Sequence, residues 1–145
     1  LDGLEVRSLY EEAFTLAVPS NNPLAKRANV KIDDLADETL LLLEDGHCLR
    51  DQALDVCSRI DVKESEDYRA TSLETLRQMV AAGLGITLLP KLATRGPFGS
   101  GHGLTVKEFS RPIPSRTVGA VWRKSTARTG AIKAVCETVH SSMVT

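Results

Sequence analysis

Two cysteines, Cys48 and Cys57, are the residues of this 145-residue chain with the clearest chemical potential. Apolar residues recur at helical spacing through 47–59, which predicts a helix that contains both. Over nine residues a helix turns by about 900° and rises by about 13.5 Å, so the two thiols point to opposite faces. A disulfide requires Cα atoms within about 7 Å of each other. The two cysteines can therefore be joined only if this helix unwinds.

Cys48 lies at the start of the predicted helix, where a thiolate is stabilised. First-turn N–H groups and the helix dipole favour negative charge there, as do cations at the neighbouring positions His47 and Arg50. Cys57 lies near the helix end, where the dipole has the opposite sign. An activated thiol paired with a poorly activated one is typical of a redox sensor, in which the first is oxidised and the second resolves it.

Other interpretations of these residues stay open. Both cysteines could serve as small core hydrophobes, which is the usual role of a free cysteine. His47, Cys48 and Cys57 could hold zinc, although their spacing fits no common zinc pattern. Cys48 could be a hydrolase nucleophile, although no convincing base and orienting residue accompany it. Cys136 lies on the apolar face of the last predicted helix, and we expect it in the core.

The composition is that of an ordinary globular domain, with 42% hydrophobic and 26% charged residues. No apolar run reaches the roughly 20 residues of a membrane span, and no signal peptide is visible at the start. A net charge of −1 and an aromatic content of 4% argue against nucleic-acid binding by this chain itself. Three cysteines do not read as a secreted disulfide framework, so we expect a reducing compartment, the cytoplasm.

Charge is divided unevenly along the chain. Residues 1–90 carry 17 acidic and 9 basic side chains, whereas residues 91–145 carry 2 acidic and 9 basic ones. This pattern favours charge complementarity between the two parts, and an anion-attracting patch on the second part is the alternative.

Strands alternate with helices along the chain, which predicts an α/β fold with a mainly parallel sheet flanked by helices. Besides 47–59, helices are expected from Thr71 to about Gly83 and from about Gly130 onward. The expected strands are 12–18, 40–43, 68–70, 86–89, 104–109 and 117–122. Thr71 and Glu74 match a capping box, and Gly83 is a good residue to follow a helix end.

Two segments resemble the hydrogen-peroxide-sensing OxyR regulators of the LysR-type family. They are residues 40–57 (LLLLEDGHCLRDQALDVC) and 69–90 (RATSLETLRQMVAAGLGITLLP). The GHCLRDQA segment with its second cysteine is specific to that subfamily, and the ending G-x-G-I-T-L-L-P is typical of the wider family. The resemblance is colinear over nearly the whole chain and weakest at 91–112.

The resemblance implies the regulatory domain of LysR-type regulators, a two-lobed α/β fold like a small periplasmic-binding protein. By this analogy 14–113 forms a complete second lobe, 1–13 is a crossing segment with part of the first lobe, and 114–145 adds the return strand and C-terminal helix of that first lobe. The abrupt start at Leu1 fits the middle of a larger domain. DNA would be contacted only through a winged helix-turn-helix absent from this chain.

The resemblance also implies a role for each candidate site residue. Cys48 would be the peroxidatic cysteine and Cys57 the resolving one, joined as a Cys48–Cys57 disulfide after oxidation by hydrogen peroxide. The residues that would support the thiolate or the peroxide are Gly46, His47, Asp51 and Arg116. The expected partners are hydrogen peroxide, a thiol reductant for recycling, and further copies of the full-length protein in a dimer or tetramer. No metal, cofactor or membrane is expected.

These implications describe a stoichiometric sensor of a transcription factor, not an enzyme. Two alternatives are kept. One is a LysR-type effector domain that binds a small metabolite between its lobes, which would need no thiols. The other is a thiol peroxidase, which would perform the same first step but turn over rapidly with a reductant.

Overall fold

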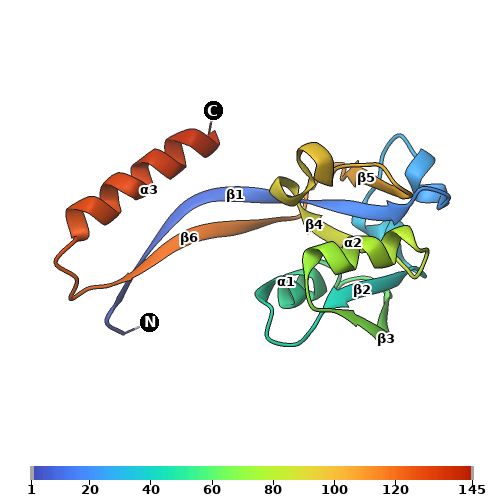
Figure 1. Cartoon of the computed structure of the whole chain (residues 1–145), viewed down its shortest axis with the longest axis horizontal. Helices are drawn as coiled ribbons and strands as arrows, with labels where there is room; N and C mark the ends of the chain where they lie inside the picture. Colours follow the sequence, from blue (N-terminus) through green and yellow to red (C-terminus); the bar gives the residue numbers. More distant parts are fainter. Residues whose placement is uncertain (1, 145) are drawn as a thin grey trace. The chain divides into compact units, whose positions relative to one another are not determined.

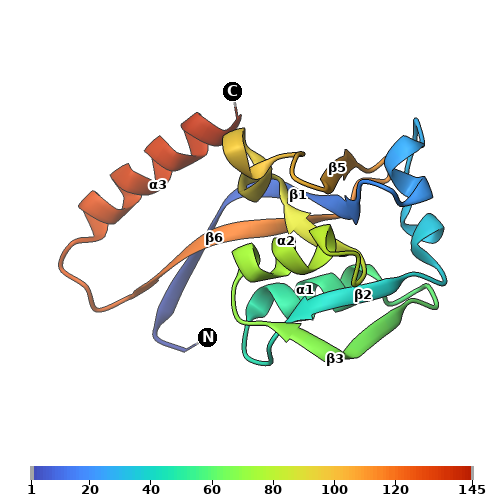
Figure 2. The same cartoon turned by 45° about the vertical axis from the view of Figure 1, so that its right-hand side comes forward.

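The apolar run at residues 40–43 forms strand β2 (Thr39–Leu43) in the computed structural model, which describes residues 2–144. Helices α1 (Cys48–Val56) and α2 (Leu73–Ala81) pack against β2, as Figure 1 shows. β2 also pairs in parallel with β3 (Lys63–Ala70), which lies beside it in Figure 2. Because its leucine side chains carry no polar group, the strand is stable where both of its faces are covered.

Strand β1 (Leu4–Pro19) is the longest strand, and it passes through two compact units of the chain. Unit 1 consists of residues 2–12 and 115–144, and unit 2 is Ala13–Pro114. In unit 2, β1 pairs antiparallel with β4 (Thr87–Pro90) and with β5 (Leu104–Glu108).

Unit 1 is built from the first part of β1, strand β6 (Ser115–Arg123) and helix α3 (Thr129–Val144). Cys136 of α3 is 2% exposed, which confirms its expected burial. Short 3-10 helices connect the strands of unit 2: η1 (Pro23–Lys26), η2 (Ile32–Leu35), η3 (Lys91–Thr94) and η4 (Gly96–Phe98). Between residues 2 and 144, no helix combines the length and apolar character needed to cross a membrane.

The mixed α/β class with parallel pairing and flanking helices is confirmed. The share of antiparallel pairing is larger than the sequence predicted, because β1 is antiparallel to β4 and β5. The expected strand at 12–18 is only the end of β1, and the expected strand at 68–70 is only the end of β3. The missed parts are mostly half-buried or exposed, so they lack the apolar run by which a buried strand is recognised.

Helix α2 has a different N-cap from the expected one. Ser72 is the N-cap, and its Oγ accepts a hydrogen bond from the Thr75 N–H at 3.1 Å. The Glu74 carboxylate instead accepts hydrogen bonds from the side chains of Arg77 and Gln78, one turn further along the helix. The capping box predicted for Thr71 is therefore wrong by one residue, because Ser72 supplies the same hydroxyl chemistry at the position where the helix begins.

The C-terminal end of α2 is as the sequence predicts. Gly83 has a φ of +87°, and its N–H donates to the Val80 carbonyl at 2.9 Å. The Leu84 N–H donates to the Met79 carbonyl at 3.2 Å, which completes a Schellman motif. Glycine is favoured there because a Cβ is strained at positive φ.

Gly85, the second glycine of the G-x-G-I-T-L-L-P ending, is required for a steric reason. A Cβ on Gly85 would lie 2.5 Å from the Thr39 carbonyl oxygen, where β2 passes close to the chain leading into β4. We expect Gly85→Ala to lower the free energy of unfolding by about 2–3 kcal/mol, because this backbone cannot give way cheaply. Urea unfolding followed by circular dichroism measures it. Gly130→Ala is the matched control, since a Cβ there meets nothing within 4 Å, and an equal loss in both variants would contradict the steric cause.

Candidate functional site

Cys48 is presented to solvent by the turn that follows β2. Gly46 allows this turn through a φ of +94°, a conformation that other residues rarely adopt. His47 is the extended N-cap of α1, and Cys48 is the first helical residue and is exposed. The thiol therefore lies at the N-terminal end of the α1 dipole and within reach of a small solute.

Cys57 lies on the other face of the same helix. Leu49, Ala53 and Cys57 repeat at a spacing of four residues, and all three are buried in the core of unit 2. Cys57 is 3% exposed and caps the helix end, where its N–H donates to the Ala53 carbonyl at 3.2 Å. The spacing rule thus holds in the structure, and both thiols are free.

Burial changes the chemistry of Cys57. Desolvation raises its pKa from 9.0 to about 11, because the thiolate loses its hydration in the apolar core. At neutral pH the Cys57 sulfur is protonated and shielded, so it is a poor nucleophile while α1 is folded.

The raised pKa of Cys57 predicts a loss of stability at high pH. The pKa is about 11 in the folded chain against 9.0 ordinarily, so the stabilising effect of the buried thiol is complete below pH 9 and is lost as pH rises through 11. We expect the free energy of unfolding to fall by roughly 1–2 kcal/mol over this range because of Cys57. Chemical unfolding of the reduced chain between pH 8 and 11.5 measures this. Cys57→Ala should lack this component, whereas Cys48→Ser should keep it; equal pH profiles in all three proteins would contradict the assignment.

Arg50 occupies a different environment from the one the sequence suggested. Its side chain is 9% exposed and turns toward β2 and β3. The guanidinium donates to the Leu43 carbonyl at 3.1 Å, pairs with Asp45 at 3.0 Å, and forms a short hydrogen bond to Glu64. Hydrogen bonding to Glu64 is the main cause that raises the pKa of Arg50, with further contributions from the charges of Asp45 and Asp51. The expected cation beside the Cys48 thiolate is therefore bound to carboxylates.

The sequence did not identify this charge network. Glu64 and Arg69 lie on β3, 14 and 19 residues from Arg50, and nothing in their spacing marks them. Arg69 closes the network by pairing with Asp45 at 3.3 Å. The burial of Arg50, which only the structure shows, is what requires such partners, because a buried guanidinium must be paired.

His47 and Asp51 both lie at the open end of α1. Both residues are exposed, and the side chain of His47 makes no capping hydrogen bond. The His47 carbonyl accepts a hydrogen bond from the Arg50 N–H at 3.0 Å, which starts the helix. Gly46, His47, Cys48 and Asp51 are thus neighbours in one accessible turn.

Arg116 belongs to unit 1 and is bound there to Glu12. Its Nε and Nη2 donate to the same Glu12 carboxylate oxygen at 2.9 and 2.7 Å, and the Glu12 side chain is buried. A charge-assisted pair of this kind fixes the guanidinium on β6. The role of Arg116 in supporting Cys48, which lies in unit 2, stays a prediction.

A zinc site is not formed by the residues considered for it. Cys57 is buried on the face of α1 opposite to Cys48, so the two sulfurs and His47 do not converge. Among residues 2–144, no three His, Cys, Asp or Glu side chains are grouped as a metal ion would need. Hydrolase chemistry at Cys48 likewise has no base and orienting pair among the contacts described.

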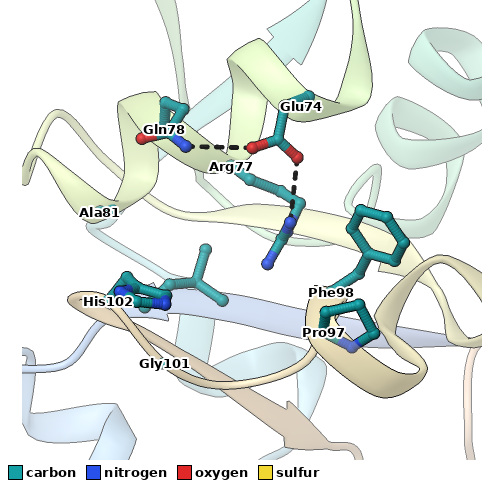
Figure 3. A pocket seen from close by; sticks show the side chains of 9 residues that line it. Glu74, Arg77, Gln78, Ala81, Pro97, Phe98, Gly101 and His102 are labelled. Carbon is teal, nitrogen blue, oxygen red and sulfur yellow. Dashed lines mark hydrogen bonds and ion pairs between the residues drawn. The ribbon is translucent and has the colours of Figure 1, made fainter.

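A separate cavity of about 210 Å³ lies between α2 and the loop at 95–103 (Figure 3). Arg77 points into this cavity, where its guanidinium lies 5.6 Å from the centre of the Phe98 ring. It also pairs with Glu74 at 3.0 Å and donates to the Gly99 carbonyl at 3.3 Å. None of the predicted site residues lines this cavity, which is smaller than a typical ligand pocket of at least about 300 Å³. We interpret Arg77 as holding the loop against α2.

Comparisons with known proteins agree with the resemblance read from the sequence. The family model described as the LysR substrate binding domain matches residues 1–144. The DNA-binding transcriptional dual regulator OxyR of Escherichia coli K12 is 44% identical over 135 residues, which is 93% of this chain and 44% of that protein. The chain thus spans less than half the length of this curated relative.

Solved structures of OxyR proteins share the fold. An H2O2-bound cysteine-to-serine mutant of Corynebacterium glutamicum OxyR has a TM-score of 0.87 at 34% identity, covering 99% of this chain and 46% of that one. A crystal structure of the oxidised form of OxyR has a TM-score of 0.82 at 42% identity, covering 98% of this chain and 66% of that one.

Proposed function

Because the chain belongs to the LysR substrate-binding domain family, we propose that it is the redox-sensing regulatory domain of a transcription regulator, in which hydrogen peroxide oxidises Cys48. The observation that carries this proposal is the contrast between the two thiols of α1. Cys48 is exposed at the helix start, whereas Cys57 is buried and its pKa is raised to about 11. Metabolite binding alone would need neither feature.

The first step oxidises Cys48. Its thiolate attacks one peroxide oxygen, the O–O bond breaks, and hydroxide leaves and takes up a proton to become water. The sulfur loses two electrons and becomes a sulfenic acid. First-turn N–H groups of α1 stabilise the thiolate before attack, and Gly46 and His47 shape the turn that exposes it. Asp51 and Arg116 are further proposed supports of this step.

The second step joins the two sulfurs. The Cys57 thiol loses its proton, its sulfur attacks the Cys48 sulfur, the S–O bond breaks, and a second water is released as the disulfide forms. The Cα atoms of Cys48 and Cys57 are separated by about 13.5 Å along a helix, so α1 must open before the sulfurs meet. This change of α1 is the signal, and a thiol reductant reverses it.

The proposal extends to the whole regulator. DNA is bound by a winged helix-turn-helix outside this chain, and the full-length protein assembles as a dimer or tetramer in the cytoplasm. Residues 14–113 form the second lobe, with 1–13 and 114–145 contributing to the first, and the division of the chain at residues 12–13 and 114–115 supports this assignment. The chain acts once per oxidation and is not an enzyme.

Disulfide mapping tests this function. The reduced chain is treated with equimolar hydrogen peroxide, alkylated under acid quench, digested and examined by mass spectrometry. A peptide linking Cys48 to Cys57 is the expected result. Free thiols at both positions would contradict the proposal, and a metabolite that then raised the melting temperature would favour an effector-binding domain. Fast multiple turnover with a thiol reductant would favour a peroxidase.

A further inference from the structure

We propose that Arg50 is a positioning residue that holds the first turn of α1 closed and thereby sets the rate at which oxidised Cys48 reaches Cys57. The inference rests on the proposed function, because it concerns the second of the two redox steps. It assigns to Arg50 a role in timing the switch, not in stabilising the Cys48 thiolate.

Arg50 ties α1 to three other segments of unit 2. Its guanidinium reaches the end of β2 at the Leu43 carbonyl (3.1 Å), the β2–α1 turn at Asp45 (3.0 Å), and β3 at Glu64. Arg69, on β3, pairs with the other oxygen of Asp45 at 3.3 Å. The side chain of Arg50 is 9% exposed, so its guanidinium is largely screened from water, although its partner Asp45 is exposed. We call Arg50, Asp45, Glu64 and Arg69 the Arg50 network.

The Arg50 network lies where the switch must move. Cys48 and Arg50 share the first turn of α1, and Asp45 lies in the turn that leads into it. To form a disulfide, the Cα atoms of Cys48 and Cys57 must approach by about 6 Å or more. If the first turn unwinds, it withdraws the guanidinium from Glu64 and the Leu43 carbonyl. Removing a buried charge from its partners is costly, so the network opposes this motion.

Peroxide attack does not require that motion. Cys48 is already exposed while α1 is closed, so its sulfur meets a small oxidant without disturbing Arg50. Loss of the network should therefore leave the first step nearly unchanged and accelerate the second. A residue that only stabilised the fold would not separate the two steps in this way.

The experiment measures the two steps separately in the full 145-residue chain. Sulfenic acid formation is timed in the Cys57→Ser background by dimedone trapping, and disulfide formation is timed in the Cys57-containing chain by acid quench and mass spectrometry. The variants are Arg50→Met, which keeps the apolar stem, and Glu64→Gln, which keeps the shape of the partner. Glu66→Gln is the matched control, because Glu66 is exposed on the same strand and outside the network.

We expect Arg50→Met and Glu64→Gln each to accelerate disulfide formation at least tenfold and to change the rate of sulfenic acid formation less than twofold. A chain that carries both substitutions should form the disulfide no faster than Arg50→Met alone, because both changes remove the same contact. Arg50→Lys should restore part of the slow rate, because it keeps the charge but not the fork of donors. Hydrogen exchange should rise in α1 and stay unchanged in β1. Glu66→Gln should match the parent in every measurement.

Parent-like disulfide rates in both Arg50→Met and Glu64→Gln would overturn the inference and would indicate that the C-terminal half of α1 unwinds instead. Faster exchange in β1 as well would overturn it by showing general destabilisation. Failure of the proposed function is distinct from both results, because the parent itself would then form no disulfide and the Cys57→Ser chain would trap no sulfenic acid.

Discussion

Replacing Cys48 by serine is expected to abolish the response of this chain to peroxide. A serine hydroxyl does not ionise at neutral pH and is not oxidised by peroxide, so no sulfenic acid forms at position 48. Cys57 cannot take over, because it is buried and its pKa is raised to about 11. The rate of peroxide consumption by the chain should fall by roughly a hundredfold or more, to the background of slow thiol oxidation. Following the peroxide that remains after addition of one equivalent measures this loss.

Cys136→Ser is the matched control for this change. Cys136 is also buried, but it lies on α3 in unit 1, whereas the two cysteines of the switch lie in unit 2. The control variant should form the disulfide at the parent rate. A Cys48→Ser chain that still consumed one equivalent of peroxide quickly would show that Cys48 is not the peroxidatic residue.

Replacing Cys57 by serine should stop the reaction halfway. Cys48 remains exposed at the N-terminus of α1, so attack on peroxide proceeds, but no second sulfur is available to displace the hydroxyl group. The sulfenic acid should accumulate to nearly one per chain, where the parent accumulates almost none. Dimedone labelling followed by intact-mass measurement detects it as a single adduct at Cys48.

The order of attack depends on this second result. A dimedone adduct at Cys57 in a Cys48→Ser chain, with none at Cys48 in a Cys57→Ser chain, would reverse the assignment of the two cysteines. Overoxidation of Cys48 to a sulfinic acid at excess peroxide is the expected fate when no resolving thiol is present, and it appears as a further mass gain that a thiol reductant does not remove.

The two expected results have one physical basis, which is the difference in environment between two thiols on one short helix. α1 spans only Cys48–Val56, and its Leu49 and Ala53 side chains face the core. The same rotation that places Cys57 beside them turns Cys48 outward. The helix therefore separates an accessible sulfur from a protected one for as long as it stays folded, and its opening removes that separation.

The sequence by itself determined the local features of this chain. The spacing of Cys48 and Cys57 against the apolar stripe of 47–59 was enough to place the thiols on opposite faces, because helical periodicity is a property of neighbouring residues. The buried run at 40–43 and the glycine that ends α2 were likewise readable from their own residue types. The motif GHCLRDQA also indicated the protein family.

Tertiary structure decided the features that depend on residues distant in the chain. Glu64 and Arg69 reach Arg50 only because β3 lies beside β2, and no spacing rule connects them. The antiparallel pairing of β1 with β4 and β5 joins segments about 70 to 90 residues apart. The raised pKa of Cys57 follows from the core that surrounds it. Local periodicity determines which face a side chain occupies, whereas burial and charge partners arise from packing between segments that the sequence keeps apart.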